Sequence, residues 1–128
     1  MKYLSAEQVL FIHVRLISET GGAQGLRDLR LLQSAVARPQ ATFDGKDLYT
    51  DLFSKAAALL ESLISNHAFV DGNKRVAITS TSLFLRINDY QLIVNNQQLV
   101  KFTLECAQRL VSLEQMAAWL NEHAERMN

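Results

Sequence analysis

Two long apolar segments follow one another closely in the middle of the chain, at about residues 50–66 and 73–87. Both are apolar on nearly every side of a helix, and a helix of this kind belongs at the centre of a domain. We therefore expect two buried helices joined by a short loop that they hold firmly. Their apolar residues are Leu52, Phe53, Ala56, Ala57, Leu59, Leu60, Leu63 and Ile64 in the first, and Val76, Ala77, Ile78, Leu83, Phe84 and Leu85 in the second.

The N-terminal segment predicts a helix over about residues 5–20. Ser5 and Gln8 have the spacing of a capping box, in which each side chain bonds the main chain of the other residue. The pair Gly21-Gly22 ends the predicted helix, since glycine adopts the left-handed conformation of a C-terminal cap. The inner face of this helix is expected to carry Leu10, Val14 and Ile17.

Three more helices are expected, which makes about six in all. One begins with Asp28 as N-cap and stops before Pro39, because the residue that precedes a proline is pushed out of helical geometry. A short extended segment at about 90–94 comes before two final helices, at about 96–110 and 113–126. The prediction is an all-α fold, a single compact helical domain over residues 1–128.

Charge and composition exclude several classes of partner. The 13 basic and 13 acidic residues cancel, so the chain as a whole does not attract nucleic acid or anionic membranes. No apolar run approaches the roughly 20 residues that span a bilayer, and the N-terminus lacks a signal peptide. We therefore expect a soluble cytoplasmic protein that binds neither nucleic acid nor membrane directly. Cys106 is the only cysteine, so it forms no intramolecular disulfide, and we expect a buried, inert thiol.

The loop between the two central segments holds unlike polar groups. His67 can accept or donate a proton near neutral pH, and Asp71 is an oxygen ligand suited to Mg²⁺. Gly72 permits a main chain that curls around an anion. Lys74 and Arg75 lie in the first turn of the next helix, where free N–H groups favour phosphate. This combination is typical of phosphoryl or nucleotidyl transfer.

A purely structural interpretation of the same loop is open as well. His67 can cap the helix before it, Gly72 can form a turn, and the two cations can be solvated. A histidine elsewhere, His13, lies among apolar neighbours and is expected to be structural. Lys55 lies in an apolar segment, and we expect its ammonium group to reach outward to solvent. The residues alone leave both interpretations of the loop open.

The string His-x-Phe-x-Asp-Gly-Asn-Lys-Arg, from His67 to Arg75, resembles the motif of the Fic/Doc family in its Doc-type form. The likeness extends along almost the whole chain, for example at Gly25-Leu26-Arg27-Asp28 and at Trp119-Leu120. Doc-type chains are toxins of toxin–antitoxin pairs. The resemblance thus implies a Fic/Doc-like helical domain and a toxin activity that inhibits translation.

Two positions separate this chain from the AMP-transferring Fic enzymes, which have glycine at the position of Lys74 and arginine at that of Ile78. The bulky cation at Lys74 fills space that the α-phosphate and its continuation would need. The resemblance therefore implies a kinase that moves the terminal phosphate of ATP to a serine or threonine hydroxyl. AMP transfer, and a catalytically weak module that acts mainly by binding an antitoxin, are the alternatives.

The resemblance also assigns roles within the motif. It makes His67 the general base and Asp71 the ligand of Mg²⁺, while Phe69 is expected to anchor the loop. Residues Phe43, Gly45 and Tyr49 fall in the region that resembles the family's target-docking flap. The implied protein target is elongation factor Tu, and the implied partner is an antitoxin with a flexible C-terminal segment. The residues expected to hold phosphate are Gly72, Asn73, Lys74 and Arg75.

Overall fold

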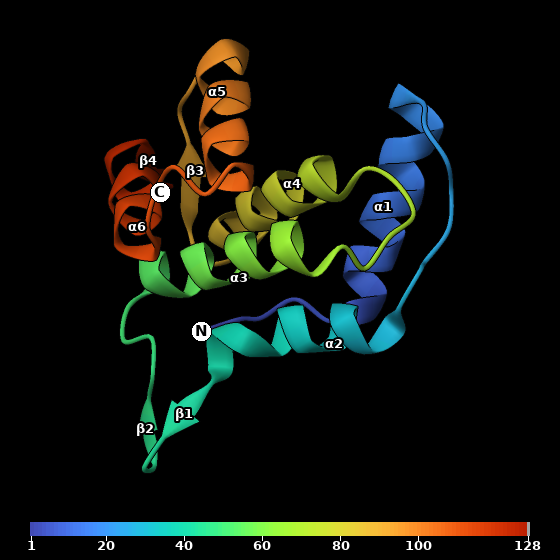
Figure 1. Ribbon diagram of the computed structural model, residues 1–128. Coiled ribbons are helices and arrows are strands. Elements are labelled where there is room, and N and C mark those ends of the chain that lie inside the picture. The colour runs from blue at the N-terminus through green and yellow to red at the C-terminus, as the bar shows by residue number, and fades with distance from the viewer. Residues whose placement is uncertain (128) are drawn as a thin grey trace.

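The computed structural model describes residues 1–127, and six α-helices make up most of this part of the chain (Figure 1). The all-α class and the predicted number of helices are confirmed. A short 3-10 helix, Arg38–Gln40, follows the second α-helix. The helices are α1 (Ala6–Thr20), α2 (Leu29–Ala37), α3 (Leu52–Asn66), α4 (Asn73–Ile87), α5 (Asn96–Ala107) and α6 (Leu113–Glu122).

Helices α3 and α4 form the centre of the molecule, as their composition predicted. The α3 helix packs against α2, α4, α5 and α6, and α1 packs against α4 (Figure 1). Leu60 of α3 and Val76 of α4 are fully buried, and Leu63 is 2% exposed. The loop at residues 67–72 joins these two helices, so both of its ends are fixed in the core.

The predicted helix boundaries are largely confirmed at the N-termini. The predicted capping box of Ser5 with Gln8 begins α1, and capping boxes with the same spacing begin α5 (Asn95 with Gln98) and α6 (Ser112 with Gln115). The Asp28 side chain accepts hydrogen bonds from the first turn of α2, so it is the N-cap. These side chains accept main-chain N–H groups that have no partner within the helix.

The predicted inner face of α1 is partly wrong. Val14 is 51% exposed, whereas Val9, His13 and Ile17 are buried. The buried stripe follows the spacing i, i+4, i+8 from Val9, which packs beside the N-terminal cap. The face is therefore rotated relative to the prediction, and it turns His13 into the protein.

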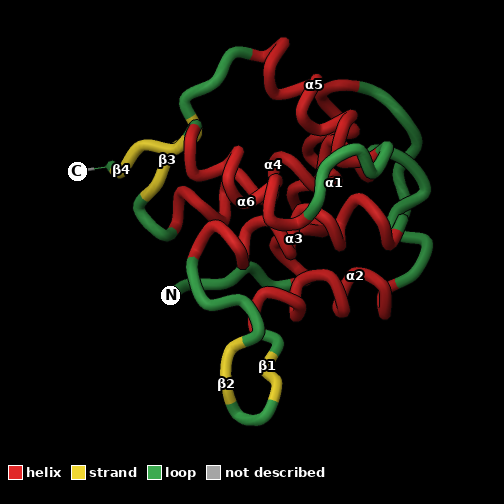
Figure 2. Tube along the Cα trace, turned by 60° about the vertical axis from the view of Figure 1, so that its left-hand side comes forward, coloured by secondary structure: helices red, strands yellow, loops and turns green. Residues whose placement is uncertain are grey.

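Two small antiparallel sheets complete the described chain. In the first, β1 (Thr42–Phe43) pairs with β2 (Lys46–Asp47) around a turn at Asp44 and Gly45, and this hairpin projects from the helices (Figure 2). In the second, β3 (Tyr90–Leu92) pairs with β4 (Ala124–Arg126). The prediction of helix up to residue 126 is wrong, because the chain leaves α6 after Glu122 to pair with β3.

The α5 helix ends three residues earlier than predicted. It stops at Ala107, and Arg109 adopts the left-handed conformation with φ of 60°. This turn brings the chain back towards the C-terminal end of α3. Within residues 1–127, no helix is both long enough and apolar enough to cross a membrane.

Candidate active site

The loop between α3 and α4 is held by buried residues. Ala68 and Phe69 are each 2% exposed. At its two ends the main chain is left-handed, with φ of 50° at His67 and 77° at Gly72. A Cβ atom at residue 72 would lie 2.8 Å from Cδ1 of Ile17, so the close approach of α1 as well as the positive φ favours glycine there.

A second segment, residues 23–28, lies along the loop and bonds its main chain. The N–H groups of Arg27 and Asp28 donate to the Ala68 carbonyl at 2.7 and 3.0 Å. The Val70 N–H donates to the Gly25 carbonyl at 3.0 Å. The loop is therefore supported along its length as well as at its ends, which is the rigidity that a catalytic arrangement requires.

The Arg27 side chain closes the C-terminal end of α3. Its Nε donates to the His67 carbonyl at 2.8 Å, and its Nη2 donates to the Asn66 carbonyl at 3.3 Å. These carbonyls have no partner within the helix, and a cation is favourable at this negative end of the helix dipole. This role of Arg27 was not predicted, since no local pattern connects the residue to a helix that ends 39 residues later.

His13 fixes the other end of the loop from inside the protein. It is 2% exposed, its Nε2 lies 2.6 Å from the Asp71 carbonyl oxygen, and its ring stacks on Phe69 with the centroids 3.9 Å apart. Because a carbonyl only accepts, Nε2 carries the proton and donates it. The structural role expected for His13 is confirmed.

The Asn73 side chain closes the loop on itself. Its Oδ1 accepts from the Phe69 N–H at 3.1 Å, and its Nδ2 donates to the Phe69 carbonyl at 3.0 Å. The amide is therefore used to pin the anchored Phe69 to the start of α4. Because the side chain is occupied, the main-chain N–H is the group of Asn73 that is free to bind phosphate.

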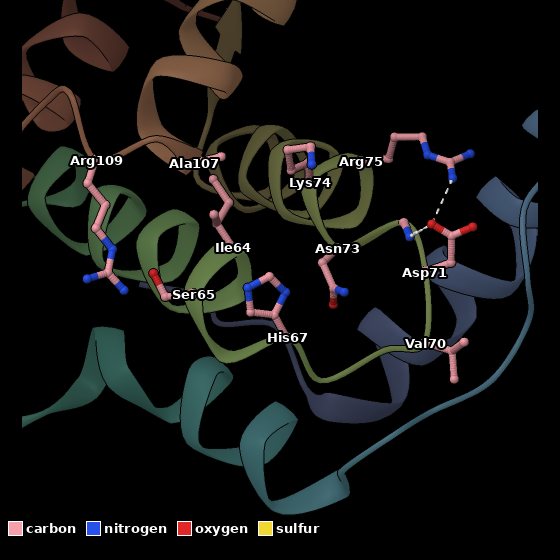
Figure 3. Close-up of a pocket in the computed structure, with 11 residues that line it drawn as sticks. Ile64, Ser65, His67, Val70, Asp71, Asn73, Lys74, Arg75, Ala107 and Arg109 are labelled. Carbon is pink, nitrogen blue, oxygen red and sulfur yellow. Dashed lines mark hydrogen bonds and ion pairs between the residues drawn. The ribbon is translucent and has the colours of Figure 1, made fainter.

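The motif residues surround one cavity of about 410 Å³ (Figure 3). All six that sequence analysis connected with catalysis, Mg²⁺ or phosphate contribute to its lining. Ser65 of α3 and Arg109 of the turn after α5 also line it, and neither was predicted. The full lining is Ile64, Ser65, His67, Val70, Asp71, Gly72, Asn73, Lys74, Arg75, Ala107 and Arg109.

Several hydrogen-bonding groups on this cavity have no partner among residues 1–127. The His67 ring and the Lys74 ammonium are exposed, and their side chains make no hydrogen bond or ion pair there. The main-chain N–H groups of Asn73, Lys74 and Arg75 are likewise free, because they form the first turn of α4 and Gly72 supplies no side-chain cap. The cavity therefore presents a proton acceptor beside a cradle of donors suited to an anion.

Asp71 and Arg75 occupy one end of the cavity (Figure 3). The Asp71 carboxylate accepts from the N–H groups of Ala23 at 3.1 Å and Gly72 at 2.7 Å, and these bonds hold the pKa of its carboxyl below the ordinary value. Arg75 donates to Thr20 and to the Gly21 carbonyl, and its Nη2 lies 3.9 Å from Asp71. The Arg75 guanidinium is thus turned towards the end of α1, away from His67.

The residues considered for target docking lie elsewhere. Phe43 and Gly45 are exposed on the hairpin, and the Tyr49 hydroxyl accepts a hydrogen bond from Arg38. The hairpin precedes the N-terminus of α3, whereas His67 follows its C-terminus, roughly 22 Å away along a helix of 15 residues. None of the three lines the cavity.

Lys55 does not reach solvent as expected. It is 3% exposed, and its ammonium group donates to the Pro39 carbonyl at 3.0 Å and lies 3.3 Å from the Asp47 carboxylate. It therefore fastens the base of the hairpin to α3. The prediction failed because both partners come from the preceding loop, whose path the periodicity of α3 does not reveal.

The sequence matches a known protein family. Residues 3–85, which include the whole loop, match the model of the Fic/DOC family. The chain belongs to the Fic/DOC family. The matched region contains α1, the segment at 23–28, all of α3 and all but the last two residues of α4, so it covers the elements that support the Fic/DOC loop.

Two named relatives agree with this assignment. The chain is 58% identical over 72 residues to the protein called Toxin Doc of Mycolicibacterium smegmatis, a match covering 56% of this chain and 55% of that protein. It is 32% identical over 117 residues to the Protein kinase doc of Escherichia phage P1, which covers 91% of each chain. The chain therefore matches just over half the length of the first relative and most of the second.

Proposed function

We propose that this chain is a Doc-type toxin that transfers the terminal phosphate of ATP to a serine or threonine hydroxyl of a protein. The observation that carries the proposal is the cavity itself, where the free His67 ring lies beside the open first turn of α4 and Lys74. The names of the two relatives, a toxin and a protein kinase, support it.

In the proposed reaction, the exposed His67 imidazole accepts the proton of the target hydroxyl as that oxygen attacks phosphorus. The main-chain N–H groups at the start of α4 and the Lys74 ammonium bind the phosphoryl oxygens, whose charge redistributes during transfer. His13 takes no part in proton transfer, because it is buried and its Nε2 is bonded to Asp71. The rigid loop keeps these groups in place without rearrangement.

Asp71 fits the expected role of Mg²⁺ ligand. Its side chain is 48% exposed, and its carboxylate accepts two N–H bonds in the structure, which leaves lone pairs for a cation. Mg²⁺ binds through one or two carboxylates together with substrate phosphates, so one such group is sufficient. When bound, Mg²⁺ would neutralise charge on the phosphates, while Arg75 and Gly72 hold the carboxylate in position.

The two positions that distinguish kinases from AMP transferases favour phosphate transfer. Lys74 lines the cavity in the first turn of α4, where its side chain takes up space beside the cradle. Ile78, one turn further along, is 9% exposed and apolar, so that position offers no cation for a second phosphate group. The N–H groups at the start of α4 therefore fit the terminal phosphate of a nucleotide better than an α-phosphate with the rest of the AMP group attached.

The proposal extends to the partners that the family resemblance implies. We propose elongation factor Tu as the target, arrest of translation in the cytoplasm as the effect, and a cognate antitoxin as the regulator. A groove of about 360 Å³ between α1, α4 and α5 offers an apolar surface for a segment of that antitoxin. Its lining includes Leu16, Ile78, Leu99, Val100 and Leu104, together with Lys74 of the active-site cavity.

The test is label transfer from ATP by purified protein with Mg²⁺ and elongation factor Tu. Label in the γ-phosphate should pass to the target, whereas label in the α-phosphate should not, and His67→Ala should abolish transfer. Transfer of the α-label would instead identify an AMP transferase. Absence of transfer of either label, with a folded protein, would contradict the kinase proposal and favour the alternative of a catalytically weak module that acts mainly by binding an antitoxin.

A further inference from the structure

Arg109 occupies a left-handed position at the end of α5 that does not require an arginine side chain. The turn after α5 is closed by main-chain bonds, from the Arg109 N–H to Cys106 and from the Leu110 N–H to Glu105. A left-handed residue at such a helix end is usually glycine, and a residue with a Cβ costs about 1 kcal/mol more there. The side chain of Arg109 therefore adds nothing to the closure of the turn.

The guanidinium of Arg109 faces the active-site cavity. It extends towards Ser65, on the same side of the loop as His67 (Figure 3). Among residues 1–127, its side chain makes no hydrogen bond or ion pair, in contrast to Arg75, which is bonded to the end of α1. Arg109 thus offers several free donors in a planar arrangement that matches a carboxylate.

A second cavity of about 340 Å³ adjoins the first at Ser65 and Arg109, which line both. Its other walls are Cys106, Val111, Met116 and Glu61. The negative charge of Glu61 is offset by Arg38, whose Nη1 lies 2.7 Å from the Glu61 carboxylate. An acidic ligand at Arg109 would therefore not meet an unpaired negative charge in this cavity.

The direction of phosphoryl transfer decides which substrate lies at Arg109. The attacking and leaving oxygens are roughly in line on opposite sides of phosphorus. His67 receives the proton of the attacking hydroxyl, so the protein substrate enters from the His67 side and the nucleotide leaves on the other. In Figure 3, Arg109 and Asp71 lie at opposite ends of the lining with His67 between them. Arg109 is therefore on the side of the protein substrate.

We infer that Arg109 and the second cavity form a subsite for the protein substrate, in which the guanidinium binds an aspartate or glutamate close to the phosphorylated residue. The inference rests on the proposed function, since the direction of attack comes from His67 acting as the base. It adds a preference that the motif itself does not specify: acceptor segments with an acidic neighbour bind more tightly than neutral ones.

The test is equilibrium binding of two labelled peptides in the absence of nucleotide, measured by fluorescence polarisation. One peptide carries threonine flanked by aspartate and glutamate, and the other carries asparagine and glutamine in their place. The parent protein should bind the acidic peptide about fivefold more tightly, as expected for a partly exposed ion pair. Arg109→Ala should remove this difference, and Arg109→Lys should restore part of it.

Arg109→Gly serves as the matched control for folding. It relieves the left-handed strain, so thermal unfolding should occur at the same or a higher temperature, while the acidic preference should still be lost. Equal binding of the two peptides by the parent protein, or an unchanged preference in Arg109→Ala, would overturn the inference. Binding of neither peptide would overturn it as well. Label transfer is measured separately, so failure of the kinase proposal is recognised independently.

Discussion

The hydrogen bond from His13 to Asp71 should control the position of the loop at residues 67–72. His13→Phe keeps a ring that can stack on Phe69 but removes the donor that lies 2.6 Å from the Asp71 carbonyl oxygen. A carbonyl left without its partner costs about 1–3 kcal/mol, and this bond is only partly buried, so we expect about 1–2 kcal/mol. For a chain of this size the melting temperature should fall by roughly 4–8 °C.

His13→Gln is the complementary variant. Its side-chain amide can still donate to the Asp71 carbonyl, but it lacks the ring, so the stacking on Phe69 is lost at a cost of about 0.5–1.5 kcal/mol. Calorimetry gives the stability of both variants, and γ-label transfer gives their activity. If the hydrogen bond positions the loop, His13→Gln should retain more activity than His13→Phe at equal fraction folded. Full activity and an unchanged melting temperature in His13→Phe would refute this account of the loop.

Three other outcomes are expected. Arg27→Ala leaves the carbonyls of Asn66 and His67 without their donor, so the free energy of unfolding in urea should fall by about 1–2 kcal/mol and label transfer should be slower. An unchanged free energy of unfolding and an unchanged transfer rate would exclude a role for this cap. Lys55→Met removes the bond to Pro39 and should speed tryptic cleavage after Lys46, whereas Lys101→Met, at an exposed position on α5, should not. Burial raises the pKa of the Cys106 thiol to about 12, so the folded protein should react slowly with thiol reagents near neutral pH and quickly once unfolded. Fast reaction of the native thiol would contradict its burial. The free energy of unfolding should also fall as pH rises above 9.0, because only the unfolded thiol ionises there.

The central helices were predictable because their signal is local. Apolar residues repeat along residues 52–66 and 73–87 regardless of what lies beside them, and a helix with such a surface has to be buried. The capping boxes at Ser5 and Ser112 are also local, since each joins residues three apart. The same reasoning placed the loop between two core helices without any knowledge of its partners.

Two of the errors concern contacts between distant segments. The last strand pairs with residues 90–92, more than 30 positions earlier, and nothing within residues 124–126 reveals that partner. Lys55 is buried because the chain folds back over it to offer the Pro39 carbonyl and the Asp47 carboxylate. An ammonium group in an apolar helix was expected to reach solvent, but a partner supplied by another segment satisfies it instead.

The residues of the candidate site were predictable, but the orientation of some side chains was not. The motif brings His67, Asp71 and Lys74 to one cavity, as expected of a short loop between fixed helices. Asn73 bonds the main chain of Phe69 instead of facing the cavity alone, and Arg75 turns towards α1. These orientations depend on which acceptors neighbouring segments supply, and that information does not lie within the motif.

The central claim is that the terminal phosphate binds at the start of α4 within reach of His67. It is tested most directly by a crystal structure of this protein with Mg²⁺ and a non-hydrolysable ATP analogue. The account predicts the γ-phosphate on the N–H groups of residues 73–75, with Mg²⁺ on Asp71 and the His67 ring facing the side opposite the leaving oxygen. An α-phosphate in that cradle, or a triphosphate bound away from His67, would contradict it.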